Sequence, residues 1–402
     1  MKHLKRVILS LMTAVMFVLP MPGLSCTFSF AKVSAEPELA ADSAVLMESA
    51  SGEILYDKNM DKTEYPASTT KIMTGLLAIE NLDYDDTVTV SRRAADVVVE
   101  GANLDCKYGE QFKVKDVVYG LMLHSANEMA VILAEAVSGS ESAFAELMNE
   151  RAEEIGCTGT HFVTPNGLPD ERHVTTARDL ALISREAMKN EKFAEVVATV
   201  NYTIPPTNMS EERKVKNSNF MLYKKGKLEI DGVERPYKYK GLKGIKTGYT
   251  NAAQGCLVEE AERKDLDLLC VTLHSGDDKR FHDAIQLLDW GFANYTMKTL
   301  IPSDEEVAEC NVKKGEERRV AAVPESDIKV CVEKTSSGGK LDRSEYTWKI
   351  QEKEFTAPVK KGKNAGQLKL YKEGKLIGVY ELETQEEVRL SWWRRLLKKV
   401  VH

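Results

Sequence analysis

The chain has 402 residues, a net charge of -7 at pH 7 and 43% hydrophobic residues. This length is enough for two or three domains of ordinary size. The mildly acidic balance argues against nucleic acid as a partner, because nucleic-acid-binding surfaces are basic. These features predict a globular protein with more than one domain.

Residues 1–35 have the pattern of a secretory signal peptide. A basic start is followed by an apolar run at 7–19, and residues 33–35 are small enough for a cleavage site. Two prolines interrupt the run, which is short for a membrane-spanning helix. We therefore expect the segment to be removed, and the mature protein to be exported rather than held by a retained helix.

Six cysteines would remain after cleavage. They show no Cys-x-x-Cys spacing, so neither a zinc site nor a redox motif is expected. An exported protein could pair them. Three lie in apolar, strand-like runs, which favours buried free thiols there. The six are Cys106, Cys157, Cys256, Cys270, Cys310 and Cys331.

The first half of the mature chain is expected to be mainly helical. Two short strands at 44–47 and 53–56 precede the helices. Ser138 and Glu141 resemble a capping box at the start of one helix, which Gly156 ends. The periodicity predicts helices at about 68–80, 114–123, 128–137, 141–155 and 176–188, with a long loop at 161–174.

The character changes to strand from residue 244. An antiparallel meander with strands at 255–259 and 266–273 is predicted, followed by a last helix at 279–295. Helices in the middle and strands at both ends predict an α/β domain with a mainly antiparallel sheet, assigned to residues 36–298.

Two further regions follow Pro302. Alternating apolar and polar residues predict a small, β-sandwich-like domain at 302–386. In 387–402, tryptophan, leucine and valine fall on one helix face and arginine and lysine on the other, which favours a membrane-anchoring amphipathic helix. The alternative is a cationic tail that is disordered or packs on the β domain.

The stretch Ser68-x-x-Lys71 suggests an activated nucleophile. Positions i and i+3 share one helix face, so the lysine amine can reach the serine hydroxyl. A serine becomes nucleophilic when a base takes its proton, and lysine can do so only with a lowered pKa. By itself the tetrapeptide favours a capped helix with a solvated lysine.

Two further motifs follow in chain order, Ser125-Ala126-Asn127 and Lys246-Thr247-Gly248. Such a set occurs in penicillin-binding proteins and class A β-lactamases, with Asp where this chain has Ala126. Pro-Ala-Ser-Thr-Thr-Lys-Ile-Met-Thr, Leu-His-Ser-Ala-Asn-Glu, Thr-Pro-Asn-Gly-Leu, Thr-Thr-Ala-Arg-Asp-Leu-Ala and Gly-Ile-Lys-Thr-Gly-Tyr-Thr extend the match. Residues 40–298 thereby resemble the low-molecular-mass D-alanyl-D-alanine carboxypeptidases, serine peptidase family S11, and the β domain and tail fit that family's layout.

The resemblance implies a β-lactamase/transpeptidase-like fold and a role for each motif residue. Ser68 would attack the terminal D-Ala-D-Ala bond and form an acyl-enzyme, Lys71 would accept its proton, and Ser125 would relay a proton to the leaving amine. The implied substrate-binding residues are Asn127, Lys246 and Thr247 for the peptide and its carboxylate, Gly248 for close approach, and Tyr249 with Ser68 for the oxyanion hole.

The resemblance also implies partners and a location. The substrate would be a peptidoglycan stem peptide ending in D-Ala-D-Ala, and β-lactam antibiotics would be covalent inhibitors. The enzyme would act at the outer face of the cytoplasmic membrane, held there by its C-terminal helix. We expect neither cofactor nor metal.

Three other functions remain open on the sequence. A β-lactamase would need a Glu-x-x-x-Asn loop motif, and here Thr175 stands four residues after Glu171. A penicillin-binding sensor would need a signalling domain, which is not visible. An endopeptidase or transpeptidase would differ only in the bond cut or the acceptor used.

Overall fold

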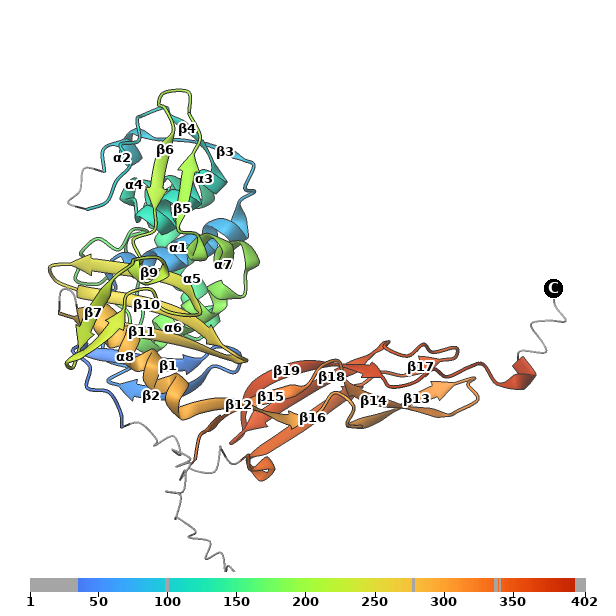
Figure 1. The fold of residues 1–402 in the computed structure, drawn as a ribbon. Coiled ribbons are helices and arrows are strands. Elements are labelled where there is room, and N and C mark those ends of the chain that lie inside the picture. The colour runs from blue at the N-terminus through green and yellow to red at the C-terminus, as the bar shows by residue number, and fades with distance from the viewer. Residues whose placement is uncertain (1–34, 98–100, 277–278, 336–338, 340, 395–402) are drawn as a thin grey trace, which may run out of the picture.

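The computed structural model describes residues 35–97, 101–276, 279–335, 339 and 341–394. It consists of a large α/β unit and an elongated all-β unit that extends from it (Figure 1). The expected signal peptide lies outside the described residues, apart from residue 35. The expected tail helix at 387–402 was wrong at its start, because Val388 and Leu390 form bridges with the all-β unit; residues 392–394 form one helical turn, and 395–402 lie outside.

The large unit is built on a five-stranded antiparallel sheet of order β2-β1-β11-β10-β9. Its N-terminal hairpin joins the later meander, with Val45 opposite Val271. The strand at one edge is β9. The bounds are β1 (Ser43–Glu48), β2 (Glu53–Lys58), β9 (Leu242–Thr250), β10 (Gln254–Arg263) and β11 (Leu266–Ser275).

Alternate residues of these strands enter two cores, as the period-2 geometry of a strand requires. Val45 and Met47 of β1 pack with the helical layer, whereas Ala44 and Leu46 pack under α8 (Lys279–Asn294). The sheet is therefore covered on both faces. The helical layer comprises α1 (Lys71–Asn81), α3 (Val114–Tyr119), α4 (Asn127–Ser138), α5 (Glu141–Ile155), α6 (Ala177–Met188) and α7 (Glu191–Ala198).

Smaller elements complete the unit. Helix α2 (Arg92–Ala95) and three two-stranded antiparallel sheets lie outside the main sheet. One pairs β3 (Thr87–Thr89) with β4 (Gln111–Lys113), and the other two are the hairpins β5 (Asn201–Ile204) with β6 (Arg213–Lys216) and β7 (Lys227–Ile230) with β8 (Val233–Pro236). A short helix, η3 (Phe220–Leu222), follows β6.

The cap of α5 differs from the expected one. Ser138 is the last residue of α4, and Ser140 caps α5 by accepting the Ala143 backbone N–H on its Oγ at 3.2 Å. The predicted capping box at Ser138 was therefore wrong. The predicted end is confirmed, since Gly156 ends the helix with φ +98°.

The all-β unit has a six-stranded sheet of order β16-β18-β19-β14-β13-β17 and a two-stranded ribbon of β12 and β15. Strand β12 follows α8 directly. The domain boundary that the sequence predicted between residues 298 and 302 falls at the end of β12. A short helix, η4 (Arg343–Glu345), precedes β16. The strands are β12 (Tyr295–Ile301), β13 (Ala308–Lys313), β14 (Arg319–Pro324), β15 (Ile328–Glu333), β16 (Tyr346–Glu352), β17 (Phe355–Thr356), β18 (Asn364–Lys372) and β19 (Lys375–Thr384).

Several contacts join the units, among them an ion pair between Lys329 and Asp265 at 2.7 Å and a hydrogen bond from the Tyr295 hydroxyl to Leu55 O at 3.2 Å. The Nζ of Lys372 lies 2.6 Å from Glu53 Oε1, and Cys331 is buried in the core that includes Leu46 and Trp290. The six described cysteines are all free thiols. Within the described residues, every helix is too short or too polar to span a bilayer.

Candidate active site

Ser68 lies in a short 3-10 turn, η1 (Ala67–Thr70), which leads directly into α1. Side chains at i and i+3 eclipse one another in a 3-10 turn, so the first residue of α1 stands over Ser68. That residue is Lys71, whose Nζ is 2.9 Å from Ser68 Oγ. The sequence predicted one continuous helix here, and the tighter turn brings the two groups together.

The amine of Lys71 is fully buried and surrounded by three oxygen atoms. Besides Ser68 Oγ, Nζ donates to Asn127 Oδ1 at 2.8 Å and to Asn166 O at 2.7 Å. Burial lowers the pKa of Lys71 well below its usual value, the charge of Lys246 lowers it further, and the charge of Glu128 opposes them.

This coordination has a consequence for the neutral amine. A neutral amine has two N–H groups and one lone pair. The amide oxygen of Asn127 and the carbonyl of Asn166 can only accept, so they take the two N–H groups. The lone pair is then left for the hydroxyl of Ser68, which is the arrangement a general base requires.

The second motif lies at a helix junction. A π-helical turn, η2 (Gly120–His124), ends at Ser125, which has a left-handed φ of +65°. Helix α4 begins at Asn127, and this buried first residue extends to Lys71. Ser125 is partly exposed in the turn just before it.

The third motif lies on edge strand β9. Lys246 is 1% exposed, and its Nζ donates to Thr247 O at 3.0 Å. Burial lowers the pKa of Lys246 to about 7, and the charge of Arg280 contributes. The hydroxyl of Thr247 lies 2.8 Å from that of Ser218, a residue that the sequence did not single out.

Gly248 brings β9 against the nucleophile turn. A Cβ atom on Gly248 would lie 3.1 Å from Pro66 O, Ser68 N and Thr69 N. Such a contact is tighter than ordinary packing, so the close packing of β9 against this turn requires a residue without a side chain at Gly248. The next residue, Tyr249, exposes 42% of its surface.

The loop 161–174 supplies site residues that the sequence reasoning missed. Asn166 contributes its backbone carbonyl to Lys71, and Thr74 Oγ1 donates to Pro165 O at 2.6 Å. A Cβ atom on Gly167, which has φ +80°, would lie 1.9 Å from Ala67 O. The stretch Thr-Pro-Asn-Gly-Leu carried the signal, but only as a family resemblance.

His173 fixes the same loop from within. Its Nδ1 accepts the backbone N–H groups of Val163 at 2.9 Å and Thr164 at 3.2 Å. Burial lowers its pKa to about 4, so the imidazole is neutral near pH 7. With Nδ1 accepting, Nε2 carries the proton and donates to Thr70 Oγ1 at 2.8 Å.

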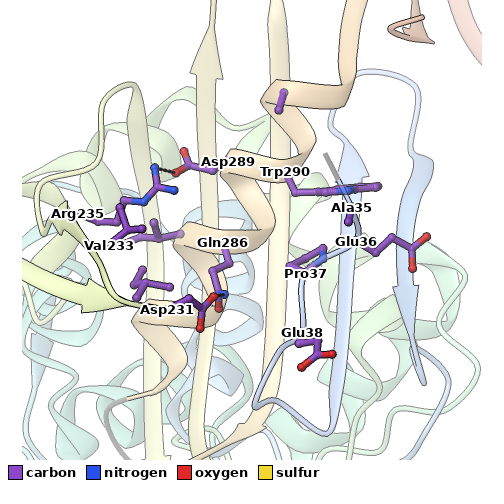
Figure 2. Close-up of a pocket in the computed structure, with 13 residues that line it drawn as sticks. Ala35, Glu36, Pro37, Glu38, Asp231, Val233, Arg235, Gln286, Asp289 and Trp290 are labelled. Carbon is purple, nitrogen blue, oxygen red and sulfur yellow. Dashed lines mark hydrogen bonds and ion pairs between the residues drawn. The ribbon is translucent and has the colours of Figure 1, made fainter. Parts of the chain in front are cut away.

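A separate cavity of about 630 Å³ lies on the α8 side of the sheet. Figure 2 shows Arg235 and Asp289 on one side and Trp290 with the N-terminal segment on the other. None of its described lining residues belongs to the three motifs. Among the described residues, no group of three or more His, Cys, Asp or Glu side chains is arranged to hold a metal ion.

Comparison with known protein families identifies the family to which this chain belongs. Residues 30–277 match the peptidase S11 family model, described as D-alanyl-D-alanine carboxypeptidase. Residues 295–389 match the model for the C-terminal domain of penicillin-binding protein 5. The chain is a member of the S11 D-alanyl-D-alanine carboxypeptidase family. This carboxypeptidase is thus a serine-type hydrolase with a transpeptidase-like domain followed by a β domain, as its sequence predicted.

Individual relatives match over most of the chain. The carboxypeptidase is 30% identical to DacF of Bacillus subtilis, over 99% of its own length and 98% of the relative's. Penicillin-binding protein 5 from Haemophilus influenzae matches with a TM-score of 0.64 and 27% identity, covering 89% of this chain and 99% of that one. The Streptomyces K15 DD-transpeptidase is 30% identical with a TM-score of 0.58, and covers 65% of this chain and 100% of that one.

Proposed function

We propose that Ser68 is the nucleophile with which this carboxypeptidase removes the terminal D-alanine from peptidoglycan stem peptides. Ser68 Oγ attacks the carbonyl of the last peptide bond while Lys71 Nζ takes its proton. D-Alanine leaves with a proton delivered through Ser125, and water then hydrolyses the acyl-enzyme. The observation that carries this proposal is the buried amine 2.9 Å from the hydroxyl, with its other two contacts already made to acceptors.

The remaining motif residues would bind the substrate. The packing of Gly248 against the turn of Ser68 supports an oxyanion hole formed by the backbone N–H groups of Ser68 and Tyr249. Lys246 and Thr247 would bind the terminal carboxylate, since an arriving anion favours the protonated lysine. Asn127 would hold Lys71 in place and contact the substrate's amide groups.

We infer that β-lactams acylate Ser68 and leave slowly. Among solved structures, penicillin-binding protein D2 from Listeria monocytogenes, in its ampicillin-bound form, matches with 27% identity and a TM-score of 0.54. Rapid release of the acyl group would need a carboxylate that activates water. The loop candidate, Glu171, is exposed on the surface, and Lys71 contacts amide and hydroxyl oxygens rather than an acid.

The direct experiment compares wild type with Ser68→Ala. Wild type should release D-alanine from a diacyl-Lys-D-Ala-D-Ala tripeptide and carry a fluorescent penicillin that peptide mapping places on Ser68. Ser68→Ala should lose both activities by at least about 1,000-fold. Ser140→Ala, which removes a helix cap, is the matched control and should keep both. Rapid nitrocefin hydrolysis without D-alanine release would contradict the proposal.

We also propose that the mature enzyme is exported and held at the membrane by residues 387–402. Trp392 and Trp393 support this, since they are 51% and 63% exposed with rings stacked 3.7 Å apart. Paired indoles beside a cationic sequence suit the boundary between lipid and water. The full mature chain should sediment with anionic lipid vesicles, whereas a chain ending at residue 386 should stay in solution. Equal sedimentation of both would refute an anchor in this segment.

A further inference from the structure

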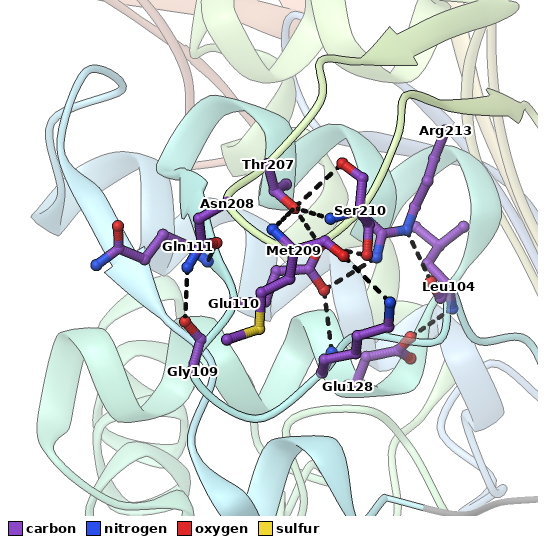
Figure 3. Close-up of polar contacts among 11 residues, drawn as sticks. Leu104, Gly109, Glu110, Gln111, Glu128, Thr207, Asn208, Met209, Ser210 and Arg213 are labelled. Atoms are coloured by element: carbon purple, nitrogen blue, oxygen red, sulfur yellow. Dashed lines mark hydrogen bonds and ion pairs between the residues drawn. The ribbon is translucent and has the colours of Figure 1, made fainter.

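The first turn of α4 contacts the active site on one side and a loop on the other. The backbone N–H of Asn127 donates to Ala102 O at 3.0 Å, while its side chain contacts the lysine amine. The next residue, Glu128, is buried, and its Oε1 accepts the backbone N–H of Leu104 (Figure 3). Segment 101–104 is therefore fixed directly to the turn that carries Asn127.

Arg213, the first residue of β6, holds the same segment from the other side. Its Nε donates to Leu104 O at 2.9 Å, and its Nη2 lies 2.9 Å from the carboxylate of Glu110. Thr207, in the turn between β5 and β6, donates to Glu110 Oε1 at 2.5 Å. Figure 3 shows Arg213, Glu110 and Glu128 converging around Leu104. The backbone of Leu104 is thus held on two sides: Glu128 of α4 accepts its N–H, and Arg213 of β6 donates to its carbonyl.

The charge of Glu128 also acts on the pKa of the Lys71 amine. The charged and titratable groups around that amine come from three elements: Lys246 from β9, Glu128 from α4 and His173 from loop 161–174. His173 is neutral near pH 7, and Lys246 repels a proton on the amine. Glu128 acts in the opposite direction and raises the pKa of Lys71. Because a buried charge is weakly screened, its removal should be felt at the amine.

We propose that Glu128 is a positioning residue for the carboxypeptidase reaction. It fixes segment 101–104 against the turn that carries Asn127, and its buried carboxylate lies one residue from the side chain that contacts the Lys71 amine, without touching substrate. The inference rests on the proposed role of Lys71 as the base. The length of the Glu128 side chain serves the contact with Leu104, and its charge acts on Lys71. Substitution by Asp changes the length alone, and substitution by Gln changes the charge alone.

Glu128→Gln keeps an acceptor for Leu104 N–H and removes the charge. The Lys71 amine should then stay neutral to lower pH, so the acidic limb of kcat/KM for D-alanine release should move down by roughly one pH unit. Glu128→Asp keeps the charge and shortens the reach. Its acidic limb should stay at the wild-type pH while the rate of penicillin acylation falls by about tenfold or more.

Glu110→Gln is the matched control, because Glu110 is equally buried and belongs to the same network. It should lower the temperature of unfolding by weakening the Arg213 contact and leave the acidic limb in place. An unshifted limb in Glu128→Gln, or equal shifts in the Gln and Asp variants, would overturn the inference. If instead Lys71→Ala keeps its acylation rate, the proposed function itself fails.

Discussion

At the residue scale, the candidate site contains two buried lysines. Lys71 is fully buried and Lys246 is 1% exposed, and both have lowered pKa values. Burying an ammonium group costs free energy, and a buried lysine avoids that cost by releasing its proton and becoming a neutral amine. The burial that lowers the pKa of Lys71 therefore also weakens the fold at neutral pH, as is common for active-site residues.

Lys246 gives a test of this cost. Its pKa is about 7 in the folded protein, against about 10.4 in an unfolded chain. Between these values the unfolded state binds the extra proton, so the free energy of unfolding rises with pH by up to about 1.4 kcal/mol per unit. Lys246→Met should therefore raise the melting temperature at pH 7, and its advantage over wild type should shrink by pH 9. A difference that calorimetry finds equal at both pH values would contradict this assignment.

At the element scale, three pieces of backbone meet around Ser68. The turn η1 carries the hydroxyl, edge strand β9 packs against it through Gly248, and loop 161–174 covers it through Gly167. Both glycines permit approaches that a side chain would block. The positions of Ser68 and Lys71 thus depend on backbone packing as much as on hydrogen bonds.

Gly167→Ala should separate the loop from the nucleophile turn. Its Cβ would lie 1.9 Å from Ala67 O, so we expect a loss of about 3 kcal/mol or more in the free energy of unfolding. Penicillin acylation should slow as well. Gly139→Ala is the control, because Gly139 has a similar φ of +77° with nothing within 4 Å of its Cβ. That variant should lose only about 1 kcal/mol, measured by urea denaturation, and acylate normally.

The sequence predicted the long, strongly periodic elements well and the local ones poorly. The helices at 141–155 and 176–188 have clear apolar faces, and they form as expected. The hairpins β5–β6 and β7–β8 were missed, because four-residue strands that are mostly polar carry little periodicity.

The same limit applies to the site. The motif spacing predicted the contact between Ser68 and Lys71, since i and i+3 are neighbours in any helical turn. The backbone carbonyl of Asn166 and the left-handed Gly167 depend on how a distant loop folds back, which no local pattern encodes. Ser218 and Glu128 were missed for the same reason.

At the scale of the whole molecule, the three sequence motifs all lie within the large unit. Every motif residue precedes α8, and the contacts of the all-β unit with the large unit include those of Lys372, Lys329 and Cys331. The Streptomyces K15 DD-transpeptidase structure matches 65% of this chain over 100% of its own length. We therefore propose that hydrolysis of a soluble substrate does not require the all-β unit.

Removing residues 295–402 tests this division. Hydrolysis of a soluble tripeptide should persist within about a factor of three, because the core around the site is complete without them. The melting temperature should fall, since Trp290 and its neighbours lose the cover that Cys331 provides. A folded but inactive truncated chain would show that the all-β unit contributes to catalysis.

The free thiols bear on how the protein acquires its fold. Five of the six described cysteines are buried, and burial raises the pKa of Cys256 to about 12 and that of Cys270 well above its usual value. Oxidation proceeds through the thiolate, which is scarce at such positions. The six described cysteines form no disulfide bonds. The described architecture therefore needs no oxidising catalyst to form, and a reductant has no disulfide to break among these residues.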